Sequence, residues 1–239
     1  NVLCLSEAKG MDIIMTEEAD YMKMLGGTKE FQIFSVIQNQ SVTHYKLDYK
    51  KRTMEEIPFQ SDGYGYITMS LDENSFYYAG GDAHLKENIF QYSFDSKETE
   101  VCVKKEEIAD WAEDSKMAVI GVYDEKLIFG VHAGKNLRWF YKDMNQQKIY
   151  ELLLPQKLPR EGAQINSIIG QTKDGLYFDY YITNQETGDK GDWSTWYGYI
   201  SWEDLLSGKN DVKVVLYPRV SSGGDLVDKD GNVIGTESR

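Results

Sequence analysis

The sequence predicts an all-β repeat fold, in which four-stranded antiparallel sheets follow one another along the chain. Three observations support this prediction. A third-strand pattern recurs at near-constant spacing, aromatic-rich second strands recur between its copies, and polar turns occupy matching positions in each copy. Such a pattern is typical of a chain whose repeats stack, because a single sheet cannot bury both of its faces alone.

The third-strand pattern has an aromatic residue three positions before an aspartate. Its copies are residues 41–48, 88–95 and 136–143. Asp48 and Asp95 are 47 positions apart, and Asp143 follows 48 positions later. A fourth copy, residues 196–204, departs from the pattern, because Trp202 stands where the aspartate is expected. A polar insertion over residues 184–192 explains its late arrival.

The other strands and turns recur with the third strands. Second strands are predicted at residues 30–36, 75–79, 126–130 and 176–181, each after a polar turn. First strands are predicted at 21–25, 66–71, 117–123 and 164–171, and turns between third and fourth strands at 48–53, 95–99, 143–147 and 203–211. Two helical segments are expected, a short turn at 205–209 and a loop helix over 106–116 with apolar residues at i, i+3 and i+4.

Four antiparallel strands in every ~40–50 residues form the blade of a β-propeller. The chain resembles the divergent, motif-poor bacterial β-propellers, because it lacks Trp-Asp pairs at strand ends, the kelch Gly-Gly signature and a Ser-x-Asp-x-Gly box. The resemblance covers about residues 19–219, is architectural, and transfers no catalytic residue. A β-sandwich is the alternative.

We expect one propeller domain over residues 1–239. Its four full blades are residues 19–60, 61–108, 116–160 and 161–219. A fifth, closing blade combines residues 1–18 with residues 220–239, because such closure removes exposed sheet edges. The alternative is a fragment of a larger propeller.

Composition and charge exclude some classes of function. The chain has 39 acidic and 26 basic residues and a net charge of −13, which argues against nucleic-acid binding. It contains no run of 18 apolar residues, so no transmembrane segment is predicted.

The cysteines and the aromatic content bear on localisation. Cys4 and Cys102 fall in different blades, so we expect two free thiols. Few cysteines, 17 tyrosines and the acidic bias favour a secreted or envelope-attached protein, with the cytoplasm as the alternative. Asn1 begins the sequence without a signal segment, which predicts a trimmed or mature product.

Loops that leave second and fourth strands share one face of a propeller, and that face is the expected place for a ligand. These loops include residues 59–64, 80–87, 106–116, 132–136, 155–164 and 184–192. The candidate ligand-binding residues are Asp82, His84, His132, Asp189, Asp192 and Trp193. They could hold a polar ligand, and Trp193 could supply a stacking surface. No cofactor and no metal site is predicted, since a metal needs three or more converging ligands.

Enzyme motifs are missing from the sequence. No P-loop, dinucleotide fingerprint, Gly-x-Ser-x-Gly elbow, Cys-x-x-Cys or His-Glu-x-x-His occurs. The predicted first strands contain no Asp or Glu, which argues against a propeller glycosidase with carboxylates along its axis. We therefore expect no catalytic residues and a binding or scaffold module for a peptide, glycan or protein. The alternative is a glycosidase-like hydrolase with loop carboxylates Asp82, Asp189 and Asp192.

Overall fold

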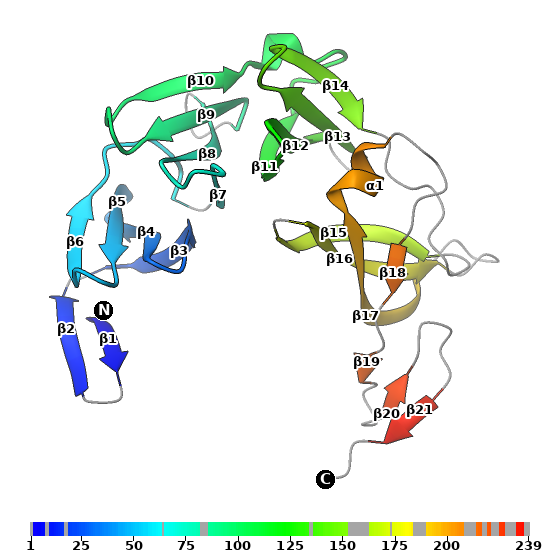
Figure 1. Cartoon of the computed structure of the whole chain (residues 1–239), viewed down its shortest axis with the longest axis horizontal. Helices are drawn as coiled ribbons and strands as arrows, with labels where there is room; N and C mark the ends of the chain where they lie inside the picture. Colours follow the sequence, from blue (N-terminus) through cyan, green and yellow to red (C-terminus); the bar gives the residue numbers. More distant parts are fainter. Residues whose placement is uncertain are drawn as a thin grey trace. The chain divides into compact units, whose positions relative to one another are not determined.

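The computed structural model confirms the all-β prediction (Figure 1). It describes residues 2–7, 10–16, 19–63, 65–81, 86–133, 136–152, 163–172, 174–183, 190–207, 214–216, 219–220, 225–227 and 233–236. The strands of these ranges form antiparallel sheets, and four of the sheets have four strands. The chain divides into two compact units, Asn1–Tyr150 and Glu151–Arg239.

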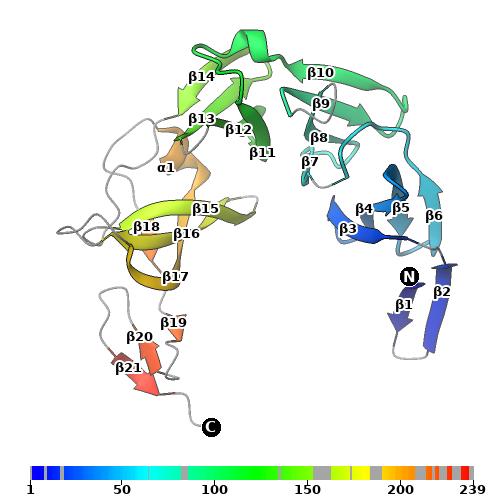
Figure 2. The same cartoon turned by 180° about the vertical axis from the view of Figure 1, so that it is seen from behind.

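The first unit contains three consecutive four-stranded sheets, in each of which sequential strands are neighbours. Sheet 1 consists of β3 (Tyr21–Gly27), β4 (Phe31–Gln38), β5 (Ser41–Asp48) and β6 (Thr53–Glu56). Sheet 2 consists of β7 (Ile67–Met69), β8 (Ser75–Gly80), β9 (Asn88–Ser93) and β10 (Thr99–Val103). Sheet 3 consists of β11 (Lys116–Tyr123), β12 (Lys126–Ala133), β13 (Asn136–Asp143) and β14 (Lys148–Leu152). Figure 2 shows, as Figure 1 does, that sheet 2 lies between sheets 1 and 3.

The second unit contains the fourth such sheet. Sheet 4 consists of β15 (Ala163–Gln171), β16 (Gly175–Thr183), β17 (Lys190–Ser201) and β18 (Val214–Leu216). A three-stranded sheet follows, formed by β19 (Arg219–Val220), β20 (Asp225–Val227) and β21 (Val233–Thr236). At the start of the chain, β1 (Val2–Glu7) pairs with β2 (Gly10–Thr16). The composite closing blade, the count of five and the blade boundaries stay predictions.

The core explains the aromatic content of the sequence. Side chains alternate along β8, so that Phe76 and Tyr78 pack in a cluster with sheet 1, while Tyr77 and Ala79 pack in a cluster with sheet 3. All four are buried. The middle strand of sheet 2 is therefore apolar on both faces, as expected for a sheet stacked between two others.

Two of the three repeated aspartates, Asp48 and Asp143, act as turn formers. The carboxylate of Asp48 accepts a hydrogen bond from the backbone N–H of Lys51 at 2.7 Å. The carboxylate of Asp143 accepts bonds from the N–H groups of Asn145 and Gln146 at 3.0 and 2.9 Å. Aspartate is favoured in turns because its side chain bonds nearby backbone N–H groups in this way. The sequence spacing thus marks the turns between third and fourth strands.

The expected helix over residues 106–116 is wrong. Only a three-residue 3₁₀ turn, η2 (Lys105–Glu107), forms, and β11 begins at Lys116. Ile108 is extended and buried in the cluster between sheets 2 and 3, and Trp111 packs against the same cluster. The apolar spacing therefore reflects two separate contacts with the core and not a helix face.

A short helix directly follows the third strand of sheet 4. α1 (Trp202–Leu206) begins three residues earlier than the expected helical turn. Ser201 caps it, because its hydroxyl accepts a hydrogen bond from the N–H of Asp204 at 3.1 Å. No helix in the described part of the chain is long and apolar enough to cross a membrane.

Candidate functional site

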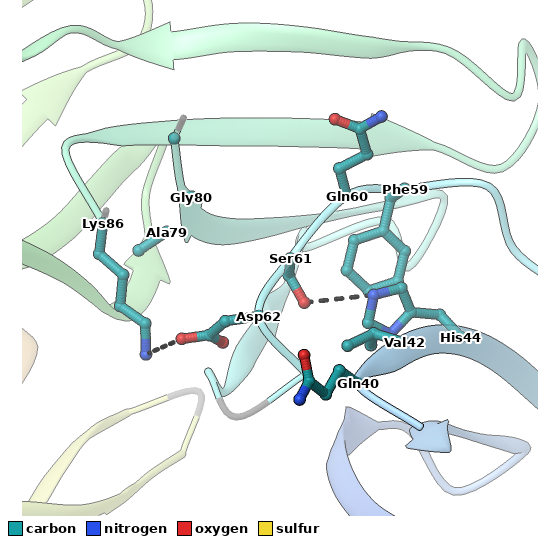
Figure 3. Close-up of a pocket in the computed structure, with 11 residues that line it drawn as sticks. Gln40, Val42, His44, Phe59, Gln60, Ser61, Asp62, Ala79, Gly80 and Lys86 are labelled. Carbon is teal, nitrogen blue, oxygen red and sulfur yellow. Dashed lines mark hydrogen bonds and ion pairs between the residues drawn. The ribbon is translucent and has the colours of Figure 1, made fainter. Parts of the chain in front are cut away.

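A cavity of about 340 Å³ lies between sheets 1 and 2, within the first unit (Figure 3). Its lining comes from three places: β5 and the turn before it, the segment between β6 and β7, and the end of β8 with the loop that follows. The lining residues are Gln40, Val42, His44, Phe59, Gln60, Ser61, Asp62, Ala79, Gly80, Gly81 and Lys86. Two of the loops named from the sequence, residues 59–64 and 80–87, thus contribute to one cavity.

His44 forms the base of the cavity. It lies on β5 and is 3% exposed. Its ring stacks on the ring of Phe59, with centroids 3.9 Å apart and planes 17° apart. Its Nε2 lies 3.3 Å from the hydroxyl of Ser61, whereas its buried Nδ1 has no hydrogen-bond partner among the described atoms.

Burial determines the protonation state of His44. Removal from water disfavours the charged ring and lowers its pKa from 6.5 to about 4, although the negative charge of Asp62 acts in the opposite direction. The imidazole is therefore neutral near pH 7.

Ser61 is held by the turn that it begins. Its hydroxyl accepts a hydrogen bond from the N–H of Gly63 at 3.1 Å. The carbonyl of Gly63 in turn accepts one from the buried hydroxyl of Ser35 at 2.6 Å. Gly63 has a φ of +76°, a conformation that favours glycine, and a Cβ there would meet Val42 and Ile37. The turn carrying Ser61 and Asp62 is thus tied to β4 beneath it.

An ion pair joins the connection between β6 and β7 to the loop between β8 and β9. The Nζ of Lys86 lies 3.2 Å from the carboxylate of Asp62, and both side chains are partly exposed (Figure 3). Asp62 also accepts a hydrogen bond from the N–H of Gly65 at 3.1 Å. The backbone of Lys86 is fixed from sheet 3, because the N–H of Met117 donates to its carbonyl at 2.6 Å. Both charges therefore have defined positions.

A second cavity, of about 470 Å³, adjoins the first. The two share Gln60 and Gly81. The second cavity is lined by Pro58, Gln60, Tyr78, Gly81, Glu87, Asn88, Phe90, Lys97 and Thr99. Burial raises the pKa of Tyr78 above its ordinary value, and hydrogen bonds with the Thr99 side chain and the Gln60 backbone oppose the rise. The bond between the Gln60 backbone and Tyr78 holds the segment that separates the two cavities against sheet 2.

The candidate residues named from the sequence have different outcomes. Asp82, His84 and Asp189 lie outside the described residues, although Gly81 and Lys86, on either side of the first two, line the cavity. Asp192 and Trp193 belong to strand β17 and not to a loop, and their side chains lie outside the described part. His132 is exposed near the end of β12, opposite Lys116 and Leu137.

None of the lining residues was among those candidates, including the four with titratable or nucleophilic side chains: His44, Ser61, Asp62 and Lys86. The polar turn at residues 61–63 was a usable signal, since it follows a buried aromatic residue. Nothing local signals that His44 lies beneath that turn. Within the described ranges, no group of three His, Cys, Asp or Glu residues is placed to hold a metal ion.

The repeated four-stranded antiparallel sheets have the fold of the blades of divergent, motif-poor β-propellers. Among solved structures, the chain is similar to TolB from Acinetobacter baumannii, with 11% sequence identity and a TM-score of 0.56 over 96% of this chain. It is also similar to a putative TolB from Agrobacterium tumefaciens, with 11% identity and a TM-score of 0.55 over 86% of this chain. The chain spans 57% of the first protein and 68% of the second. Neither a family model nor a curated protein matches the sequence.

Proposed function

We propose that the chain is a non-enzymatic binding or scaffold module for a partner protein, and that the cavity between sheets 1 and 2 is its ligand site. One observation carries the proposal. Side chains from three separate segments meet in this cavity, on a base formed by the buried pair His44 and Phe59. Loops on a rigid scaffold are the usual place for recognition, and the cavity has the size of a small-ligand or side-chain site.

The chemistry of the cavity favours binding over catalysis. Ser61 and His44 are a nucleophile and a base in contact, but a base with a pKa of about 4 is poorly matched to proton abstraction near pH 7. A catalytic triad also requires a group that orients the second ring nitrogen, and the described residues offer no partner to Nδ1. No described residue favours the hydrolase alternative.

Replacement of both members of the ion pair by uncharged residues tests the ligand site. A double variant, Asp62→Asn with Lys86→Ala, should weaken ligand binding by at least about tenfold, because it breaks the ion pair that joins two of the segments lining the cavity and removes hydrogen-bonding groups that face it. Peptide and glycan arrays would supply the ligands, and calorimetry the affinities. The matched control is Asp48→Asn with Lys51→Ala, an exposed pair 3.5 Å apart in the turn after β5. Equal affinities for both double variants and the unmodified chain would exclude this cavity as the ligand site.

We also propose that the protein works outside the cytoplasm, secreted or attached to the cell envelope. Support comes from the aromatic-rich, cysteine-poor and acidic composition. Fractionation of cells that express the full gene tests it. Recovery with the cytoplasmic fraction would favour the alternative.

The way in which the strands form sheets supports a further proposal, that the propeller is a closed ring. The four-stranded sheets repeat as the sequence predicts, and residues 1–18 and 220–239 contribute further strands, β1–β2 and β20–β21. We propose that these strands form a fifth blade. An experimental structure of the full protein tests this, and further four-stranded blades from outside this sequence would favour the larger propeller.

A further inference from the structure

The two cavities form one groove that crosses from sheet 1 to sheet 2. They meet at Gln60 and Gly81, which line both. Gln60 is exposed and its backbone bonds with Tyr78, so the side chain lies over a fixed support. A ligand that fills one cavity can therefore extend into the other over Gln60 and Gly81, which form the waist of the groove.

The lining residues that the structure describes are balanced in charge, whereas the chain as a whole is acidic. The first cavity has Asp62 and Lys86, and the second has Glu87 and Lys97. Both carboxylates already have a lysine partner, because Glu87 lies 2.7 Å from the Nζ of Lys105. In a chain with a net charge of −13, this is a local departure. The described lining residues therefore supply little net charge with which to select a charged ligand.

The remaining polar groups of the groove are amides and hydroxyls. Gln40 and Gln60 line the first cavity, and Gln60, Asn88 and Thr99 line the second. A side-chain amide both donates and accepts hydrogen bonds, which is the pattern that a peptide main chain requires from its partner.

The described aromatic residues of the groove offer little open ring surface to a sugar. Phe59 is 4% exposed and stacks against His44. Phe90 stacks on Tyr78, with ring centroids 5.4 Å apart, and Tyr78 is buried. Among the described lining residues, a sugar would thus meet at most the partly exposed ring of Phe90, one face of which is covered by Tyr78.

We infer that the ligand is an extended, uncharged polar peptide segment of a partner protein, which lies across both cavities with its main chain over Gln60 and Gly81. This inference rests on the proposed function and specifies its ligand. Hydrogen bonds and shape supply the affinity, so ionic strength has little effect on it.

A peptide library displayed on phage, selected on the folded chain, tests the inference. Synthetic copies of the selected peptides should be uncharged, and their affinity should change less than about twofold between about 0.05 M and about 0.5 M NaCl. The variant Gln60→Trp, which places a bulky ring at the waist, should weaken binding at least about tenfold. Gln146→Trp, at an exposed turn of sheet 3, is the matched control and should leave binding unchanged. Circular dichroism checks that both variants are folded.

The possible outcomes separate the inference from the proposed function. Charged peptides with salt-dependent affinity, or glycans from an array, that lose binding in Gln60→Trp would overturn the ligand class and leave the site standing. Ligands that bind Gln60→Trp and the Asp62/Lys86 double variant as well as the unmodified chain would overturn both. Failure of the peptide library and a glycan array to give any ligand would also count against both.

Discussion

The imidazole of His44 stacks on the phenyl ring of Phe59 at a centroid distance of 3.9 Å, although one lies on strand β5 and the other in the connection to sheet 2. The contact fixes that connection against sheet 1. It also buries a titratable ring almost completely. The stability of the site and its response to pH therefore share one structural cause.

Replacement of Phe59 by alanine should lower the free energy of unfolding by about 3–5 kcal/mol, the range for loss of a large core side chain. Besides His44, its ring contacts Phe76, Tyr78 and Tyr92. Denaturant unfolding measures the loss. Phe59→Leu keeps most of the volume and should lose clearly less. Equal effects of the two variants would mean that the ring itself is not well packed.

His44 should make the protein less stable in mild acid. Its pKa is about 4 when folded and about 6.5 when unfolded, so the unfolded chain binds the proton more readily. The stabilisation is complete above about pH 6.5 and falls as the pH drops toward 4, by about 2–4 kcal/mol. Urea unfolding at about pH 7 and about pH 5 measures it.

The control for this pH effect is His44→Gln, which cannot titrate. Its urea midpoint should change less between the two pH values than that of the unmodified chain, whatever its stability at neutral pH. Parallel changes in the two proteins would show that carboxylates, and not His44, cause the acid sensitivity.

Lys46 should stabilise the contact between sheets 1 and 2 through its charge. Its Nζ lies 4.5 Å from the ring centre of Phe31 and 4.3 Å from that of Phe94. Lys46→Gln should cost about 1 kcal/mol, since cation–π contacts are worth ~0.5–2 kcal/mol. Glu55, 3.9 Å from the same Nζ and largely exposed, provides the comparison. If Glu55→Gln costs as much as Lys46→Gln, then the ion pair and not the rings is responsible.

Gly198 should not tolerate alanine. It lies on β17 opposite Phe178, and a Cβ there would collide with the ring of Phe178. Gly198→Ala should destabilise by about 1–3 kcal/mol, as overpacking does in dense cores. Thermal unfolding measures this change. Adding Phe178→Leu should recover part of the loss, and strict additivity of the two variants would argue against a collision.

Strand positions could be predicted from the sequence because they depend on local patterns. The expected third strands over 41–48 and 136–143 coincide with β5 and β13, since turn-forming Asp48 and Asp143 mark their ends. The all-β prediction and the resemblance to motif-poor propellers are likewise confirmed. The helix over 106–116 was wrong because Ile108 and Trp111 face a core that another sheet supplies.

From the sequence, only the face of the fold that carries the cavity could be predicted, and not the residues that form it. Its loops were expected on that face from the order of strands, but Gln40, Ser61 and Lys86 come together only when two sheets stack. The burial of His44 depends on Phe59, 15 positions later in another segment. The local strand and turn patterns do not encode such a contact.

The alternation along β8 also bears on how the first unit gives way under mechanical load. Phe76 and Tyr78 belong to the junction with sheet 1, and Tyr77 and Ala79 to the junction with sheet 3. Force applied at the N-terminal side that detaches sheet 1 exposes only one face of β8. The other face stays packed against sheet 3. Extension in an optical trap should therefore proceed in discrete steps, one sheet at a time, and not as a single rupture.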